Sequence, residues 1–232
     1  VRLEGTRQTD AWLMNGVSRP APPVTVSPNP ASFSQAVVGT DDFDADGRND
    51  LLFWNSVSGA AEFWLMNGAT RVGSPIALAG APEPPWKPAA TADFNRDGRP
   101  DIVFRNSSTQ KIAVWAMSGT SLAAVLTPNP DQAVDANWEI VGAQDWNADG
   151  DTDFLWYNPV SGKIVLWFMD GSLVRIAGQF TSPPNAGNNN WKVLAMGDYG
   201  LGASGLPGTI DVVWRNATSG RFVVWYMNQA GE

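Results

Sequence analysis

Apolar and polar residues alternate with a period of two through short segments that recur along the chain. Asp50-Leu-Leu-Phe-Trp-Asn55 and Lys163-Ile-Val-Leu-Trp-Phe-Met169 are rich in aromatic and β-branched residues, a composition typical of β-strands. The 23 glycines and 17 prolines are scattered so closely that no helix-length stretch is free of turn residues. The pattern predicts an all-β fold of short antiparallel strands, because a parallel sheet would need crossover helices.

The predicted strands belong to a repeat of about 52 residues. A Trp-x-Met motif begins at Trp12, Trp64, Trp115, Trp167 and Trp225, with spacings of 52, 51, 52 and 58 residues. Within a unit, one strand enters an acidic loop, a second leaves it, a third carries the motif, and a fourth follows, as in Leu173-Val-Arg-Ile-Ala177. Four strands in a unit of this length are typical of a β-propeller blade.

Five motifs predict an all-β β-propeller of about five four-stranded blades, forming a single domain over residues 1–232. The predicted units are a partial blade at 1–40 and repeats at about 41–92, 93–144, 145–197 and 198–232. The sequence starts inside one unit and stops after the third strand of another. It fits a closed five-bladed ring whose termini complete a blade, or a fragment of a larger propeller, and the closed ring is favoured because it removes exposed sheet edges.

Acidic residues gather in three loops that share one pattern. Of the 23 Asp and Glu residues, 12 lie in the windows 41–50, 93–102 and 145–154. Each loop has oxygen-bearing side chains at positions one, three, five and nine, with a glycine at position six that permits a sharp turn. Ca²⁺ takes about six to eight oxygen ligands, and the carbonyl at position seven can supply one. The predicted calcium ligands are Asp42, Asp44, Asp46, Arg48 and Asp50, then Asp93, Asn95, Asp97, Arg99 and Asp101, then Asp145, Asn147, Asp149, Asp151 and Asp153.

The loops do not match an EF-hand, and the fourth loop of the chain does not match the acidic pattern. An EF-hand would need a bidentate Glu at position twelve and flanking helices, whereas Phe53, Phe104 and Trp156 stand there, in predicted strands. The fourth loop separates Asp198 from Asp211 by 13 residues instead of 8, with no acid between them. We expect no ion in that loop.

Composition excludes several classes of function. The chain has no histidine and no cysteine, which rules out disulfides, imidazole or thiolate metal sites, and Ser-His-Asp or Cys catalysis. A formal net charge of −8 argues against nucleic-acid binding. The sequence has no stretch of 18 uninterrupted apolar residues, so we expect no membrane insertion. Because the clustered carboxylates are assigned to ions and no other acid pair stands out, we expect a protein that is not an enzyme.

The acidic loop, the Asp-led strand after it and the Trp-x-Met-Asn-Gly strand together resemble FG-GAP/VCBS-type calcium-binding repeats. Integrin α-subunit propellers and a group of fungal and bacterial propeller lectins have similar loops. The resemblance covers essentially the whole chain. The Phe-Gly tag that named the family does not recur, which favours the bacterial branch. The resemblance implies that about three Ca²⁺ ions have a structural role, each tying two strands of a blade together.

One residue per unit is a candidate for ligand contact. Trp54, Arg105, Tyr157 and Arg215 each precede an Asn at the end of the second strand, and their side-chain types suit sugar binding. The Asn itself is better explained as the start of a turn. We expect a secreted, extracellular module that binds a glycan, with a protein-interaction or adhesion propeller, or a non-catalytic module of a larger secreted protein, as the alternative. Millimolar extracellular calcium suits such loops.

Overall fold

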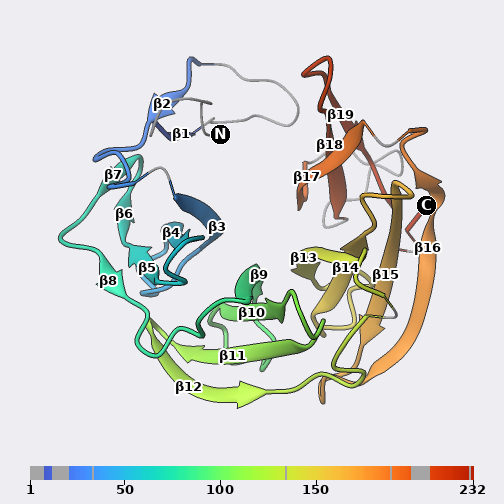
Figure 1. Cartoon of the computed structure of the whole chain (residues 1–232), viewed down its shortest axis with the longest axis horizontal. Coiled ribbons are helices and arrows are strands. Elements are labelled where there is room, and N and C mark those ends of the chain that lie inside the picture. Colours follow the sequence, from blue (N-terminus) through green and yellow to red (C-terminus); the bar gives the residue numbers. More distant parts are fainter. Residues whose placement is uncertain are drawn as a thin grey trace. The chain divides into compact units, whose positions relative to one another are not determined.

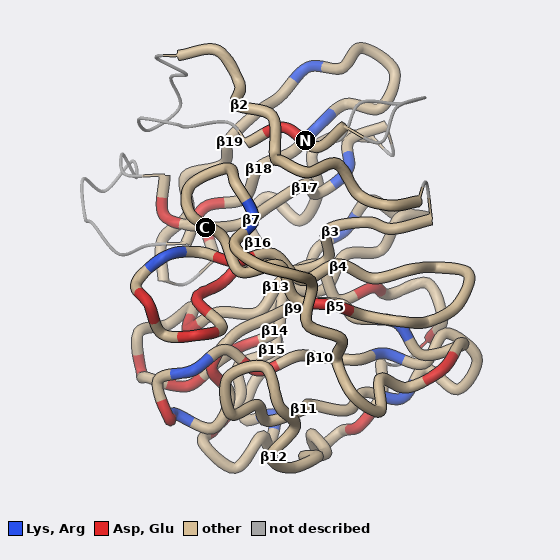
Figure 2. Tube along the Cα trace, turned by 90° about the vertical axis from the view of Figure 1, so that its left-hand side faces the viewer, with Lys and Arg blue, Asp and Glu red and all other residues tan. Residues whose placement is uncertain are grey.

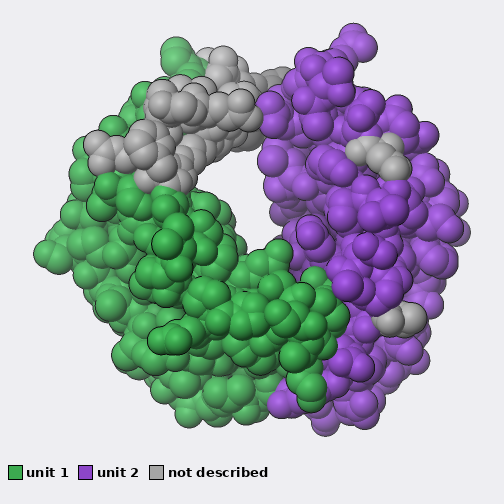
Figure 3. Space-filling model, viewed as in Figure 1, with its two compact units in different colours: residues 1–92, 97–126 green, residues 93–96, 127–232 purple. Residues whose placement is uncertain are grey.

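The computed structural model describes residues 8–11, 21–32, 34–133, 135–188, 190–199, 210–229 and 231–232. Every element of secondary structure named within these residues is a β-strand, which confirms the all-β prediction. This part of the chain contains no helix long and apolar enough to cross a membrane. The chain divides into two compact units, residues 1–92 with 97–126 (unit 1) and residues 93–96 with 127–232 (unit 2), shown in Figure 3.

Unit 1 contains two four-stranded antiparallel sheets whose strands pair in chain order (Figure 1). The first sheet consists of β3 (Gln35–Asp41), β4 (Asp50–Asn55), β5 (Ala61–Trp64) and β8 (Ile76–Ala77). The second consists of β9 (Trp86–Ala92), β10 (Asp101–Asn106), β11 (Ile112–Ser118) and β12 (Ser121–Leu126). Two small sheets pair β1 (Asp10–Ala11) with β2 (Val24–Thr25) and β6 (Met66–Asn67) with β7 (Thr70–Arg71).

Unit 2 repeats the same arrangement of strands. Its first sheet is four-stranded and consists of β13 (Glu139–Gln144), β14 (Asp153–Tyr157), β15 (Lys163–Met169) and β16 (Arg175–Asn185). Its second sheet is three-stranded and consists of β17 (Trp191–Gly197), β18 (Asp211–Asn216) and β19 (Phe222–Trp225). The expected fourth strand near Leu173–Ala177 begins later, at Arg175, and continues to Asn185.

Antiparallel sheets that follow one another along the chain in this way are the blades of a β-propeller. The described residues form four blades instead of the five predicted, three with four strands and one with three. The first Trp-x-Met motif, at Trp12, lies outside the described residues, and β1 and β2 make only a two-stranded sheet. The three strands of the last blade agree with the sequence, which stops after the third strand of that repeat.

Hydrophobic residues on facing sheets form the core of each unit. In unit 1, Leu52 and Phe63 of the first blade pack with Phe104 and Trp115 of the second. In unit 2, the corresponding cluster joins the β14–β15 side of one blade to β18 of the next. The Trp-x-Met strands contribute to the interior, since Trp64, Trp115, Trp167 and all four described methionines of the motif are buried.

The first strand of every blade contains one bulge at the same place. The extra residues are Val38, Ala89, Val141 and Leu194. Next to the bulge, Gly39 lies against Thr91 of the neighbouring blade in unit 1, so that a Cβ atom on Gly39 would meet the Thr91 methyl at 2.5 Å. Gly142 lies against Met196 in the same way in unit 2. The bulge bends each strand, and the missing side chain allows the first strands of adjacent blades to approach closely.

Candidate metal centre

The first acidic loop connects β3 to β4 and brings three carboxylates together. Oxygen atoms of Asp42, Asp44 and Asp50 all lie within 4.8 Å of one another. Figure 2 shows that many acidic residues of the chain gather in such loops between strands. These three residues were predicted as ligands of one ion, and their arrangement suits a hard cation that takes oxygen ligands.

Backbone geometry explains why the loop converges. Asp46 N–H donates to Oδ1 of Asp42 and to Oδ1 of Asp44, both at 3.1 Å, and Gly47 N–H donates to Oδ2 of Asp42 at 2.7 Å. Two residues adopt left-handed backbone conformations, Ala45 with φ 61° and Gly47 with φ 83°. The sequence predicted the turn at the glycine. The left-handed alanine was not predicted, because such a φ is uncommon for a residue with a side chain.

The third loop, between β13 and β14, has the same hydrogen bonds. Asp149 N–H donates to Oδ1 of Asp145 and to Oδ1 of Asn147, both at 3.1 Å, and Gly150 N–H donates to Oδ2 of Asp145 at 2.9 Å. Ala148 and Gly150 are left-handed, with φ of 60° and 88°. Two loops far apart in the sequence therefore present their oxygens on the same backbone frame, although Asn replaces Asp at position three of the third loop.

The second loop crosses the boundary between the two units, since residues 93–96 belong to unit 2 and residues 97–101 to unit 1. In unit 2, Arg96 is left-handed with φ 61°, as Ala45 and Ala148 are. In unit 1, Gly98 is left-handed with φ 80° and Arg99 N–H donates to Oδ1 of Asp97 at 2.9 Å. The ligand set Asp93, Asn95, Asp97 and Asp101 stays a prediction.

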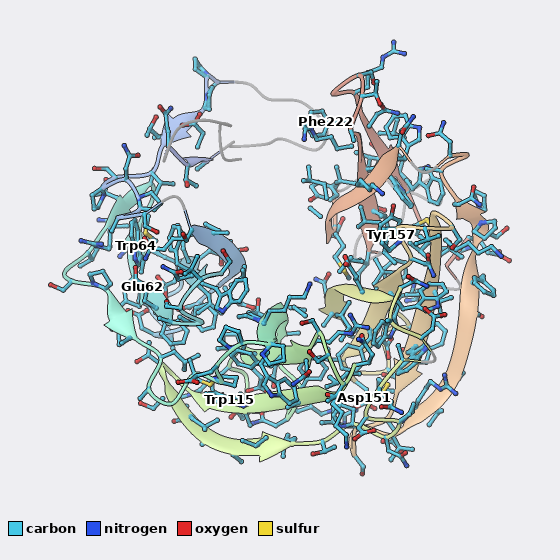
Figure 4. The ribbon with its side chains drawn as sticks, viewed as in Figure 1. Glu62, Trp64, Trp115, Asp151, Tyr157 and Phe222 are labelled. Atoms are coloured by element: carbon cyan, nitrogen blue, oxygen red, sulfur yellow. The ribbon has the colours of Figure 1, made fainter. Side chains whose placement is uncertain are left out.

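Residues at position seven were predicted to bind through their carbonyl oxygens, and that prediction also stays untested. Their side chains interact elsewhere. The Arg48 guanidinium pairs with the Asp46 carboxylate at 3.1 Å, Arg99 donates to Ser118 Oγ at 3.3 Å, and Asp151, labelled in Figure 4, pairs with Arg96. Both partners of the Arg48–Asp46 pair are exposed, so the pair contributes little stability by itself.

The aspartate at position nine has a role that the ligand prediction did not include. Its side chain is almost completely buried in every blade, with 0–1% of the surface of Asp50, Asp101, Asp153 and Asp211 exposed. One carboxylate oxygen accepts the backbone N–H of the methionine in the Trp-x-Met strand. The four distances are 2.8 Å for Met66, 2.8 Å for Met117, 2.9 Å for Met169 and 3.2 Å for Met227.

The second carboxylate oxygen of this aspartate holds the start of the loop. It accepts the N–H of Phe43, Trp146 or Tyr199, each at 3.0 Å, from the residue after position one. The aspartate thus links the loop to the third strand of its blade. We call this pair of hydrogen bonds the aspartate latch. A sequence signal for it exists, because aspartate and methionine are 16 residues apart in all four blades.

Asp211 shows that the latch does not require an acidic loop. Between Asp198 and Asp211 the sequence contains no acid, and residues 200–209 lie outside the described residues. Asp211 nevertheless accepts both backbone hydrogen bonds and is completely buried. The aspartate at position nine therefore has a structural role even in the loop where the sequence predicts no ion.

Burial and neighbouring charges make these carboxylates sensitive to a cation. The pKa of Asp153 is raised to about 6, chiefly by burial and also by the charges of Asp149 and Asp145, while the two backbone hydrogen bonds oppose the shift. Burial likewise raises the pKa of Asp50, with additional contributions from Asp44 and Asp42. A bound cation favours the charged form of each carboxylate, so ion binding would relieve this cost.

The four candidate ligand-contact residues differ in their exposure. Arg105 and Tyr157 are buried, each with 3% of its surface exposed. Tyr157 donates its hydroxyl to the Trp191 carbonyl at 3.0 Å, and Arg105 donates to Gln110 Oε1. Trp54 is half-buried against the unit 1 core, and Arg215 is exposed. The two side chains are buried inside the protein, and Tyr157 belongs to the core cluster between the blades of unit 2, which does not favour a role in ligand contact.

The asparagine after each candidate residue starts a turn, as predicted. Asn55 Oδ1 accepts the N–H groups of Val57 and Ser58 at 2.9 and 3.1 Å. The same pair of hydrogen bonds is made by Asn106, Asn158 and Asn216. Their side-chain oxygens are therefore used to shape the turn.

Replacing Asp211 with Asn should destabilise the protein by about 1–3 kcal/mol, because an amide can accept at only one oxygen and leaves a buried N–H without its acceptor. Urea unfolding measures the loss, which we expect to be the same with calcium and with a chelator. The exposed Glu139→Gln exchange controls for removal of a negative charge and should be close to neutral. A loss seen only in the presence of calcium would instead assign Asp211 to an ion site.

Comparison with known proteins supports part of these assignments. Residues 42–104 match the FG-GAP-like repeat family, a segment that runs from the first acidic loop to β10 and confirms the resemblance there. No curated protein matches the chain. Among solved structures, the chain is similar to the dihydro-heme d1 dehydrogenase NirN in complex with DHE, with 16% sequence identity and a TM-score of 0.36. That likeness covers 97% of this chain but 44% of the other, and it carries no argument about function.

Proposed function

We propose that the protein is a calcium-stabilised, non-catalytic β-propeller module that binds carbohydrate outside the cell. The convergence of Asp42, Asp44 and Asp50 within 4.8 Å carries the calcium part of the proposal. Like charges held this close repel one another unless a cation or protonation compensates them. The match of residues 42–104 to FG-GAP-like repeats also supports a calcium site in this loop.

The donor set favours calcium over other metals. All candidate ligands are carboxylate, amide or carbonyl oxygens, and the chain has no histidine or cysteine. Ca²⁺ accepts many oxygen ligands in irregular geometry, whereas Mg²⁺ requires near-octahedral geometry and keeps several waters. Asp42 and Asp44 lie before the turn and Asp50 begins β4, so an ion between them would tie the start of the loop to the second strand of the blade. Its role would be structural.

Three ions would also account for most of the acidity of the chain. Three Ca²⁺ would change the formal charge from −8 to −2, since −8 + 6 = −2. Loops of this kind fill at extracellular calcium concentrations even when their affinity is weak, which supports secretion. The acidic groups then serve the ions, and recognition of a partner must come from other side chains.

Calcium should raise the melting temperature of the wild-type protein relative to protein in EGTA, because an ion that binds only the native state stabilises it by mass action. At a free concentration of about 100 times Kd, one site contributes about 2.7 kcal/mol. Asp44→Ala should lose part of the calcium-dependent shift and keep the melting temperature measured in EGTA. Glu83→Ala, which removes an exposed acid outside the loops, should behave as wild type. Equal melting temperatures with and without calcium would refute the structural ions.

A glycan array probed with the calcium-loaded protein tests the carbohydrate part of the proposal. We expect binding to a restricted set of glycans, because aromatic and amide side chains on fixed blades select sugar shape. No binding to any glycan in the presence of calcium would remove carbohydrate as the target. It would leave a protein-interaction or adhesion module as the surviving function.

A further inference from the structure

A cavity of about 310 Å³ lies on the first blade of unit 2. Its walls come from β14, β15, β16 and the segment before β13. The aromatic lining residues are Trp138, Trp156, Trp167 and Phe180, and the polar ones include Asp135, Arg175 and Gln179. Small-molecule sites are about 300–1,000 Å³, mostly apolar, with a few polar groups that orient the ligand. This cavity is at the lower end of that range and suits one ring-sized ligand.

The aromatic residues divide into a buried floor and an accessible rim. Trp156 and Trp167 are buried, and their ring centroids lie 4.7 Å apart at an interplanar angle of 50°. Trp138 and Phe180 are more accessible; their ring centroids lie 6.3 Å apart at 46°, and 53% of the Phe180 surface is exposed. An exposed aromatic side chain beside a hollow offers its ring face to a ligand. Ring faces carry negative charge density and attract weakly positive C–H groups.

The charges around the cavity favour a neutral ligand. The Cζ atom of the Arg175 guanidinium lies 4.7 Å from the Trp167 ring centroid, and Lys163 Nζ lies 5.2 Å from the Phe180 ring centroid. Cations thus already interact with two of the rings, which disfavours a cationic guest such as a quaternary ammonium. Asp135 is oriented by the N–H of Asn137, which donates to its Oδ1 at 2.8 Å. Asp135 and Arg175 provide an acceptor and a donor for hydroxyl groups.

The second large hollow makes a useful contrast. It measures about 490 Å³ in unit 1, beside the first acidic loop. Its lining consists of Ala11, Val24, Gly47, Arg48, Asn49, Gly68 and Ala69, which includes no aromatic ring. The unit 2 cavity is smaller, but it alone of the two combines ring faces with charged hydrogen-bonding groups.

We infer that the unit 2 cavity binds a single saccharide ring, with the C–H face of the sugar against Phe180 and Trp138 and its hydroxyls at Asp135 and Arg175. This inference rests on the proposed function and names its site. It differs from the four positions considered from the sequence. Trp86, Trp138 and Trp191 each stand seven residues before the first position of their loop. Trp86 and Trp191 pack against the core clusters of their units, whereas Trp138 lines the cavity.

Isothermal titration of the calcium-loaded protein with methyl glycosides of glucose, galactose, mannose, fucose and N-acetylglucosamine tests the site. We expect one of these probes to bind, and Phe180→Ala and Trp138→Ala each to weaken that binding at least tenfold or remove one site per chain. Phe222→Ala is the matched control (Figure 4). Phe222 is also an exposed phenylalanine in unit 2, with 45% of its surface exposed against 53% for Phe180, and it does not line the cavity. This variant should bind like wild type. Melting curves identify any variant that has lost its fold, and Asp135→Asn then serves as a second variant.

The outcomes separate the site from the function. Binding of a glycoside that is unchanged in Phe180→Ala, Trp138→Ala and Asp135→Asn would overturn the cavity assignment and leave the carbohydrate function intact. No binding of any glycoside here, together with an empty glycan array, would overturn both. Binding of an apolar probe such as indole at the cavity, with no glycoside bound, would overturn the saccharide assignment.

Discussion

A buried aspartate accepts the backbone N–H of the Trp-x-Met methionine in all four blades, and in three of them it also accepts the N–H at the start of the loop. Burying a carboxylate is costly unless its charge is compensated by hydrogen bonds, and here both oxygens are used. One bond fixes the start of the loop, and the other fixes the Trp-x-Met strand. Hydrogen bonds to a charged group are worth more than neutral ones, about 1.5–3 kcal/mol each. Because the same pair recurs in blades of both units, the latch is part of the repeat itself.

The latch separates two roles that the acidic loop combines. The aspartate at position nine holds the blade together, and the residues at positions one and three present oxygens for an ion. Asp50 belongs to both sets, since it closes the latch and also lies within 4.8 Å of Asp42 and Asp44. Asp211 belongs only to the first set, because the sequence between Asp198 and Asp211 contains no acid.

Much of the fold follows from local sequence signals, and the rest depends on contacts between blades. Strands β4 and β15 lie where the period-two pattern predicts them, and the turns at Asn55 and its equivalents form as expected. The bulges at Val38 and its counterparts have no sequence signal of their own, since they depend on how first strands approach one another. The buried positions of Arg105 and Tyr157 were not predicted either, because an Arg or Tyr in a strand can face either side. Trp138 shows the reverse case, in which a residue with core-like equivalents lines a cavity.

Amide hydrogen exchange on the calcium-loaded and chelated protein tests the central claim most directly, that the aspartate latch holds the blade independently of the ion. The account predicts that chelation accelerates exchange at the loop amides of Asp149 and Gly150, while the latch amides of Met169 and Met227 stay slow in both conditions. If the Met169 amide exchanged as fast as Gly150 after chelation, the latch would depend on the ion and the account would be wrong.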